Sequence, residues 1–198
     1  MVVGVFTVGA SAAFTDNEDI QYVEAAEVLT DLNVIEGYPD GSFKPQQNLT
    51  RAEAAGLVAR MLLGRDVADT LTADTAPFSD VPADNWAAGY IAYCVQEGII
   101  AGMGDGSFNP DGLITGYGMA KLMLTALGVD AKEEGLVGDY WEFYSAKLFQ
   151  EMGLDDGVAN MDERFSANAT REECVQYALN AMNYGVMIEE ATYPVYYT

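Results

Sequence analysis

The stretch GYPDGSFKPQQNLTRAE, residues 37–53, combines a turn, a short extended piece and the start of a helix. Residues 38–41 have proline at the second and glycine at the fourth position, as a type I turn prefers. Thr50 and Glu53 have the spacing of a capping box, in which each side chain satisfies a free backbone N–H at a helix start. The stretch therefore predicts a turn, followed a few residues later by a helix that begins at Thr50.

Arg51 stands in the first turn of that expected helix, where the helix dipole disfavours a cation by about 0.3 to 1 kcal/mol. One interpretation is an arginine that reaches a neighbouring carboxylate with little net gain, since the chain has 31 acidic residues. The other is that the free N–H groups and the guanidinium together form a receptor for a carboxylate ligand.

The same pattern recurs 65 residues later, because Gly102–Pro110 aligns with Gly37–Pro45 without a gap. A third copy is weaker, and it places Trp141 on Trp86 at a spacing of 55 residues. Thr170–Glu173 rebuilds the capping box and its arginine, Arg171, whereas the corresponding run Thr115–Gly118 has neither the arginine nor the glutamate. We therefore expect one of three equivalent sites to be disabled.

Each copy has the pattern helix, loop, helix. In the first copy the apolar residues at helical spacing are Tyr22, Ala25, Ala26, Leu29 and Leu32, followed by Ala54, Leu57, Val58, Met61 and Leu62. A unit of this size cannot bury both apolar faces alone, so three units should pack around a shared centre. We expect an all-α fold of three helix-loop-helix repeats, packed as a pseudo-threefold bundle.

The repeats set the expected domain boundaries. We place modules at residues 13–63, 77–128 and 136–185, linkers at 64–76 and 129–135, and a tail at 186–198. Residues 1–12 contain an apolar run and an A-x-A pattern without a basic leader, which favours a signal-peptide remnant over an N-terminal strand. No run is long enough to span a bilayer, so no membrane insertion is expected.

Composition excludes several function classes. A net charge of −22 makes nucleic acid a poor partner, because its binding requires a positive surface. The chain has no histidine, which removes the central group of Ser-His-Asp catalysis and of most zinc sites. Asp105–Asp111 has oxygen donors at alternate positions but lacks the glycine and glutamate of a calcium loop, so we interpret it as a turn. We expect no enzyme activity, cofactor or metal, and interpret Cys94 and Cys174 as buried thiols in preference to a disulfide.

The combination of F-x-D, W, GYPDGSFKP and LTRAE resembles the S-layer homology module, which usually occurs in threes, and the likeness covers residues 13–184. The resemblance implies grooves between adjacent modules that bind secondary cell-wall polymer, typically through a pyruvate ketal on N-acetylmannosamine. Such modules anchor secreted proteins non-covalently to the bacterial cell surface. The implied partner is therefore a cell-wall polymer with a pyruvylated amino sugar.

The resemblance also implies a set of ligand-binding residues: Arg51, Arg171, Asp16, Asp80, Trp86, Trp141, Gly37 and Lys44. The arginines would hold the pyruvyl carboxylate, the aspartates sugar hydroxyls, and an indole one face of a sugar ring. Core filling explains the tryptophans equally well, and a helix C-cap explains the glycine. No module is complete, since Gln21 replaces the first tryptophan, and we expect Arg51 to cooperate with Trp86 across the first interface.

A competing interpretation is a structural subunit that self-assembles into a surface layer or filament. Residues 2–8 and 192–198 are both β-prone and could add a strand to a neighbouring chain. Self-association is therefore a second possible partnership.

Overall fold

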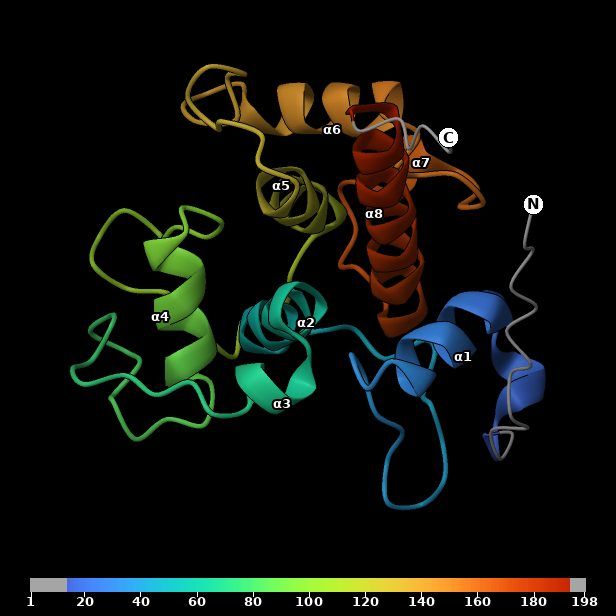
Figure 1. Cartoon of the computed structure of the whole chain (residues 1–198). Coiled ribbons are helices and arrows are strands. Elements are labelled where there is room, and N and C mark those ends of the chain that lie inside the picture. The colour runs from blue at the N-terminus through green and yellow to red at the C-terminus, as the bar shows by residue number, and fades with distance from the viewer. Residues whose placement is uncertain (1–13, 193–198) are drawn as a thin grey trace, which may run out of the picture.

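The computed structural model describes residues 14–192 and is helical throughout this range, with isolated β-bridges but no strand (Figure 1). Its elements are η1 (Asn17–Asp19), α1 (Val23–Asp31), α2 (Arg51–Leu63), α3 (Arg65–Ala68), α4 (Ala88–Gln96), α5 (Gly116–Ala126), α6 (Trp141–Glu151), α7 (Met161–Arg164) and α8 (Arg171–Thr192). The all-α class is confirmed, while the pseudo-threefold symmetry of the bundle stays a prediction. The N-terminal signal or strand and the β-prone tail from residue 193 lie outside the described residues.

The second helices of the three modules, α2, α5 and α8, contact one another in the middle of the molecule (Figure 1). Each also carries the first helix of a different module: α4 packs on α2, α6 on α5 and α1 on α8. The modules are therefore interlocked, because the main helical partner of each first helix belongs to another repeat.

Three backbone hydrogen bonds join the segments just before these central helices into a closed ring. The N–H of Leu49 donates to Ala169 O (3.2 Å), that of Ala169 to Ile114 O (2.9 Å), and that of Ile114 to Leu49 O (3.0 Å). All three residues are buried. Each comes from a different module and directly precedes the threonine that caps a central helix, so the ring fixes the three helix starts relative to one another.

The first N–H group of each central helix donates to the loop of another module. Arg51 N donates to Gly112 O (2.8 Å), Gly116 N to Ala167 O (2.9 Å) and Arg171 N to Gln47 O (2.8 Å). These bonds satisfy donors that have no partner within their own helix. They also bring each helix start against the next module's loop.

The predicted caps are present. Thr50 Oγ1 accepts from Glu53 N (3.1 Å) and Glu53 Oε2 from Thr50 N (2.8 Å). Thr170 and Glu173 repeat both bonds at 3.4 and 2.8 Å. The predicted turn is also present, because Gly41 N donates to Tyr38 O over 2.9 Å.

The helical faces are only partly as predicted. Ala25, Ala26 and Leu29 are buried, but Leu32 is 49% exposed and follows the last residue of α1. Leu62 is 39% exposed near the end of α2. Periodicity alone assigned both leucines to the core, although each lies at the C-terminal end of its helix.

Both cysteines are free and buried, as expected. Burial raises the pKa of the Cys94 thiol to about 12 and also raises that of Cys174. Both thiols are therefore protonated at neutral pH and unreactive.

Two segments differ from the expected boundaries. The linker at 64–76 contains α3, where Arg65 pairs with Asp69 (3.0 Å) and Glu36 (2.7 Å). Helix α8 continues to Thr192, beyond the expected start of the tail. None of the described helices combines the length and apolar character needed to cross a lipid bilayer.

We expect Gly102→Ala to lower the melting temperature by several degrees. A Cβ at this position would lie 2.7 Å from Ser107 O and also meet the ring of Phe78, and overpacking of this kind costs about 1 to 3 kcal/mol. For a chain of this size each kcal/mol shifts the midpoint by about 2 to 4 °C. Differential scanning calorimetry measures the change.

Gly56→Ala, within α2, is the matched control, since the nearest atom to its Cβ would be in the Tyr90 ring, at an ordinary contact distance of 3.6 Å. It should raise the midpoint, because alanine is favoured over glycine in a helix by about 0.5 to 1 kcal/mol. Equal midpoints for the two variants would contradict the close packing at Gly102.

Candidate functional site

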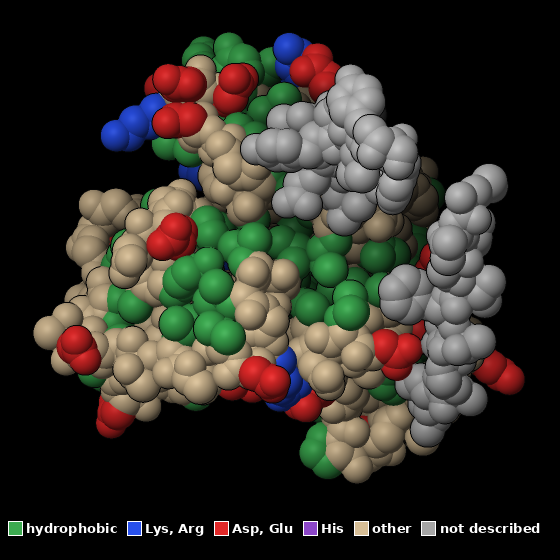
Figure 2. Space-filling view, in the orientation of Figure 1, with side chains coloured by type: hydrophobic (Ala, Val, Ile, Leu, Met, Phe, Trp, Pro, Cys, Tyr) green, Lys and Arg blue, Asp and Glu red, His purple; other side chains and the backbone are tan. Residues whose placement is uncertain are grey.

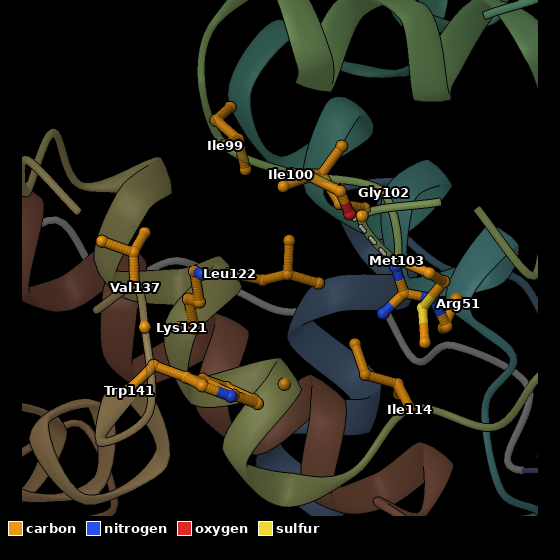
Figure 3. A pocket seen from close by; sticks show the side chains of 14 residues that line it. Arg51, Ile99, Ile100, Gly102, Met103, Ile114, Lys121, Leu122, Val137 and Trp141 are labelled. Atoms are coloured by element: carbon orange, nitrogen blue, oxygen red, sulfur yellow. Dashed lines mark hydrogen bonds between the residues drawn. The ribbon is translucent and has the colours of Figure 1, made fainter. Parts of the chain in front are cut away.

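Two grooves lie between modules, and each is lined by one of the predicted arginines. The Arg51 groove has a volume of about 440 Å³ and runs between the 99–104 loop, α5 and Trp141 (Figure 3). The Arg171 groove has a volume of about 260 Å³ and runs between the 34–39 loop, α2 and Trp86. The two loops and helices are related by the 65-residue repeat, so the grooves are equivalent places in the fold.

Each groove takes its arginine, its loop with helix, and its tryptophan from three different modules. The structure combines Arg51 with Trp141, and Arg171 with Trp86. The expected pairing of Arg51 with Trp86 is therefore wrong. The reason is that the start of each capped helix bonds to the next module's loop. The arginine at that helix start therefore lies in a groove formed by the next module's loop and second helix.

Arg51 is held by backbone carbonyl groups. Its Nε donates to Phe108 O (2.9 Å) and an Nη to Ala101 O (3.2 Å), while its guanidinium lies 4.6 Å from the centre of the Phe108 ring. Burial lowers the pKa of Arg51, and the charge of Asp80 opposes this effect. The side chain remains a cation, because arginine is protonated throughout the accessible pH range.

Arg171 is more deeply enclosed, with only 8% of its surface exposed. Its guanidinium donates to Glu36 O and lies between the rings of Tyr38 and Phe43, at 5.1 and 4.9 Å. Its Nε is buried without a hydrogen-bond partner. Burial lowers the pKa of Arg171, so its charge is costly to hold in the absence of an anion.

Neither arginine forms an ion pair with a carboxylate within the part of the chain that the structure describes. The interpretation of Arg51 as a surface arginine that reaches a nearby acid is therefore not supported. Carbonyl oxygens and aromatic faces orient both guanidinium groups but carry no full negative charge. An external carboxylate would supply that charge through paired hydrogen bonds.

Asp16 and Asp80 support the loops and do not line either groove. Asp16 accepts from the N–H groups of Phe43 (2.7 Å) and Lys44 (2.8 Å), and Asp80 from those of Phe108 (2.8 Å) and Asn109 (2.7 Å). Partial burial works against ionisation of Asp16, but its N–H donors outweigh it and lower the pKa. The Phe108 N–H is the main group that lowers the pKa of Asp80. We therefore assign both aspartates a positioning role instead of sugar contact.

The remaining predicted residues differ in position. Trp86 is 60% exposed, which is inconsistent with core filling, and Trp141 is half-buried with its ring 5.3 Å from Lys121 Nζ. Gly37 lines the Arg171 groove. Lys44 lies outside both grooves, with its Nζ 3.9 Å from the centre of the Tyr38 ring.

At the third equivalent position the backbone packs closely against residues 164–165. A Cβ at Gly116, which stands in place of the arginine, would lie 2.8 Å from Phe165 Cα. Nearby, the buried carboxylate of Glu172 accepts from Gln21 N (2.7 Å), and Arg164 pairs with Glu173 (3.2 Å). That one of the three sites is disabled stays a prediction.

Lys121 lines the Arg51 groove and was not identified from the sequence. Its position in α5 corresponds to Gly56 in α2, so the two repeats differ by a full charge at this point. An alignment of the second helices, in addition to the loops, would have revealed it.

The chain is similar in sequence to known cell-surface proteins. The S-layer homology domain model matches residues 13–55 and 77–116. The chain is 44% identical over 91 residues to Cell surface glycoprotein 1 of Acetivibrio thermocellus, covering 46% of this chain and 4% of that protein. It is 32% identical over 151 residues to a Cell surface protein of Thermoanaerobacter kivui, covering 75% of this chain and 19% of that protein.

A Cellulosome-anchoring protein of Acetivibrio thermocellus is 42% identical over 81 residues, which are 41% of this chain and 18% of that protein. The chain thus spans between 4% and 19% of the length of these three relatives.

We expect Asp80→Asn to destabilise the protein at pH 7 and to have a smaller effect in acid. The folded-state pKa of Asp80 lies below its ordinary value of about 3.9. Its contribution is therefore complete above that value and is lost as the pH falls through the folded pKa. Thermal unfolding of both proteins between pH 7 and pH 2.5 measures the difference.

Asp111→Asn serves as the control, because it removes an exposed carboxylate from the loop that Asp80 supports. It should leave the midpoint nearly unchanged at every pH. An Asp80→Asn midpoint that matches wild type at pH 7 would argue against the positioning role.

Proposed function

Because the chain belongs to the S-layer homology family, we propose that it anchors a protein non-covalently to the bacterial cell envelope. Its two open grooves would bind an acidic saccharide of the secondary cell-wall polymer, such as a pyruvylated N-acetylmannosamine. This function places the protein outside the cell, at the cell wall or in its surface layer. The name of the Cellulosome-anchoring relative supports an anchoring role.

The observation that carries this proposal is the pairing, in each groove, of an arginine that has no carboxylate partner among the described residues with an accessible tryptophan. A guanidinium binds a carboxylate through two parallel hydrogen bonds. An indole ring offers a flat apolar face to a sugar ring and an N–H to its hydroxyl groups. A pyruvylated sugar carries both features at once, because the carboxylate is on a ketal carbon that two oxygen atoms join to the sugar.

The overall charge of −22 opposes binding of an anionic polymer at long range. On the face in Figure 2, acidic side chains lie mainly toward the edges and apolar side chains occupy the middle. Screening limits this repulsion to about 8 Å at physiological salt, so the groove arginines determine the contact. We expect association to become faster when salt is added.

Binding accounts for these grooves better than catalysis does. The chain has no histidine, and burial keeps both cysteine thiols protonated. The arginines can bind and orient an anion, but neither is suited to accept or donate a proton at neutral pH. We therefore propose a binding module and not an enzyme.

Self-assembly remains a second candidate function, because α6 and the residue before it expose large aromatic side chains. Tyr140, Phe143 and Tyr144 are 72%, 63% and 43% exposed. Such a surface can join copies of a chain. Sedimentation without wall material separates the two functions, since polymers favour assembly and a monomer that binds cell-wall sacculi favours anchoring.

The chain has two tryptophans, one in each groove, so labelling with 5-fluorotryptophan gives a separate ¹⁹F NMR signal for each site. We expect both signals to shift when the methyl glycoside of pyruvylated N-acetylmannosamine is added. The same sugar without pyruvate should bind at least about tenfold more weakly, because it lacks the charge that pairs with arginine. Trp86→Phe and Trp141→Phe assign the two signals.

Substitution of one arginine should weaken ligand binding in one groove only. Arg51→Gln should weaken binding at Trp141 by about 10- to 100-fold and spare Trp86, while Arg171→Gln does the reverse. Lys147→Gln, which removes an exposed charge on α6, is the control and should change neither signal. Equal responses to the neutral and the pyruvylated sugar would refute the proposal.

A further inference from the structure

The two open grooves differ in charge. Two cations, Arg171 and Arg60, and two carboxylates, Glu36 and Glu53, line the Arg171 groove. Arg60 also pairs with a carboxylate that does not line the groove, because its Nε lies 2.8 Å from Asp69 Oδ1. The formal charges of the residues lining this groove therefore cancel.

The Arg51 groove has the opposite composition. Arg51 and Lys121 line it, and no aspartate or glutamate is among its described lining residues. The 65-residue repeat shows how the difference arises: Ala101 stands in place of Glu36, Gly118 in place of Glu53, and Lys121 in place of Gly56. Thr125 stands in place of Arg60, so two acids are lost, one base is lost and one base is gained at the equivalent positions.

Lys121 is held at the groove by its surroundings. Its Nζ lies 5.3 Å from the centre of the Trp141 ring, and none of the ion pairs in the described part of the chain includes it. Burial lowers the pKa of Lys121, and the charge of Arg51 lowers it further. Figure 3 shows Lys121 and Trp141 on one side of the pocket and Arg51 on the other.

Two cations facing one partly enclosed space repel each other, and an anion between them would relieve this repulsion. The acid that acts on Arg51 is Asp80, but its two oxygens accept the backbone N–H groups of Phe108 and Asn109 in the loop after α4. It therefore does not neutralise the groove. This groove is therefore locally positive, although the protein has a net charge of −22.

We propose that the Arg51 groove selects a saccharide with two negative charges, with one carboxylate at Arg51 and a second anionic group within reach of Lys121. The Arg171 groove accepts a saccharide with a single negative charge. Lys121 is the residue that determines this specificity. The inference rests on the proposed function of the grooves and adds that the two sites bind different parts of an anionic polymer.

Three glycosides of pyruvylated N-acetylmannosamine test this inference with the fluorotryptophan-labelled protein. The methyl glycoside has one charge, while the anomeric methyl phosphodiester and the carboxymethyl glycoside each have two. We expect at least one doubly charged ligand to bind about tenfold more tightly than the methyl glycoside at Trp141. At Trp86 the ligands should differ by less than about threefold. Which ligand gains affinity identifies the second anion as phosphate or carboxylate.

Lys121→Gln should remove the preference at Trp141 while leaving binding of the methyl glycoside within about threefold. The reciprocal variant Gly56→Lys, which adds the cation to the Arg171 groove, should create a preference for two charges at Trp86. Lys147→Gln, on α6 outside the Arg51 groove, should leave the preference intact.

An equal ratio of affinities at both tryptophans, or an equal loss of all three ligands in Lys121→Gln, overturns this inference and leaves the proposed function standing. Failure of every ligand to shift either signal overturns both. The Gly56→Lys result does not depend on removal of a native side chain, so it stays informative if Lys121→Gln folds poorly.

Discussion

The ring of backbone hydrogen bonds among Leu49, Ala169 and Ile114 is the constraint on which the rest of the structure depends. It fixes three helix starts at the centre of the molecule and brings each one against the loop of another module. An arginine that follows the cap by one residue then lies in a groove that its own module does not form. The two grooves are therefore a consequence of how the modules are joined.

The position of Arg51 and Arg171 at the positive end of a helix is understandable in this setting. The capping glutamates Glu53 and Glu173 use their oxygens to accept N–H groups at the helix starts, so they do not pair with the arginines. Carbonyl groups and aromatic rings then orient each guanidinium without cancelling its charge. Neither guanidinium therefore forms an ion pair within the described residues, and this cost is tolerable because the fold is held by the ring and the buried core.

Sequence reasoning succeeded where the signal is local. The turn at residues 38–41, the capping boxes at Thr50 and Thr170, and the buried cysteines all follow from spacings of a few residues. The pairing of Arg51 with Trp141 could not be predicted, because it depends on which module's loop accepts the bonds of each helix start. The role of Asp16 and Asp80 was assigned to sugar for a similar reason, since their loop contacts span about 27 residues. Lys121 was missed because its charge has no counterpart in the first repeat.

The interlocking of first and second helices has a consequence for how such a chain can change. Removal of a single module would leave a central helix of one neighbour and a first helix of the other without their packing partners. The three modules therefore form one structural unit. The residue that follows a capping threonine can nevertheless differ in one module without a change in the other two. Gly116 lacks the arginine side chain but still donates its N–H to Ala167 O, so the side chain at this position can change while the contact that joins the modules is kept.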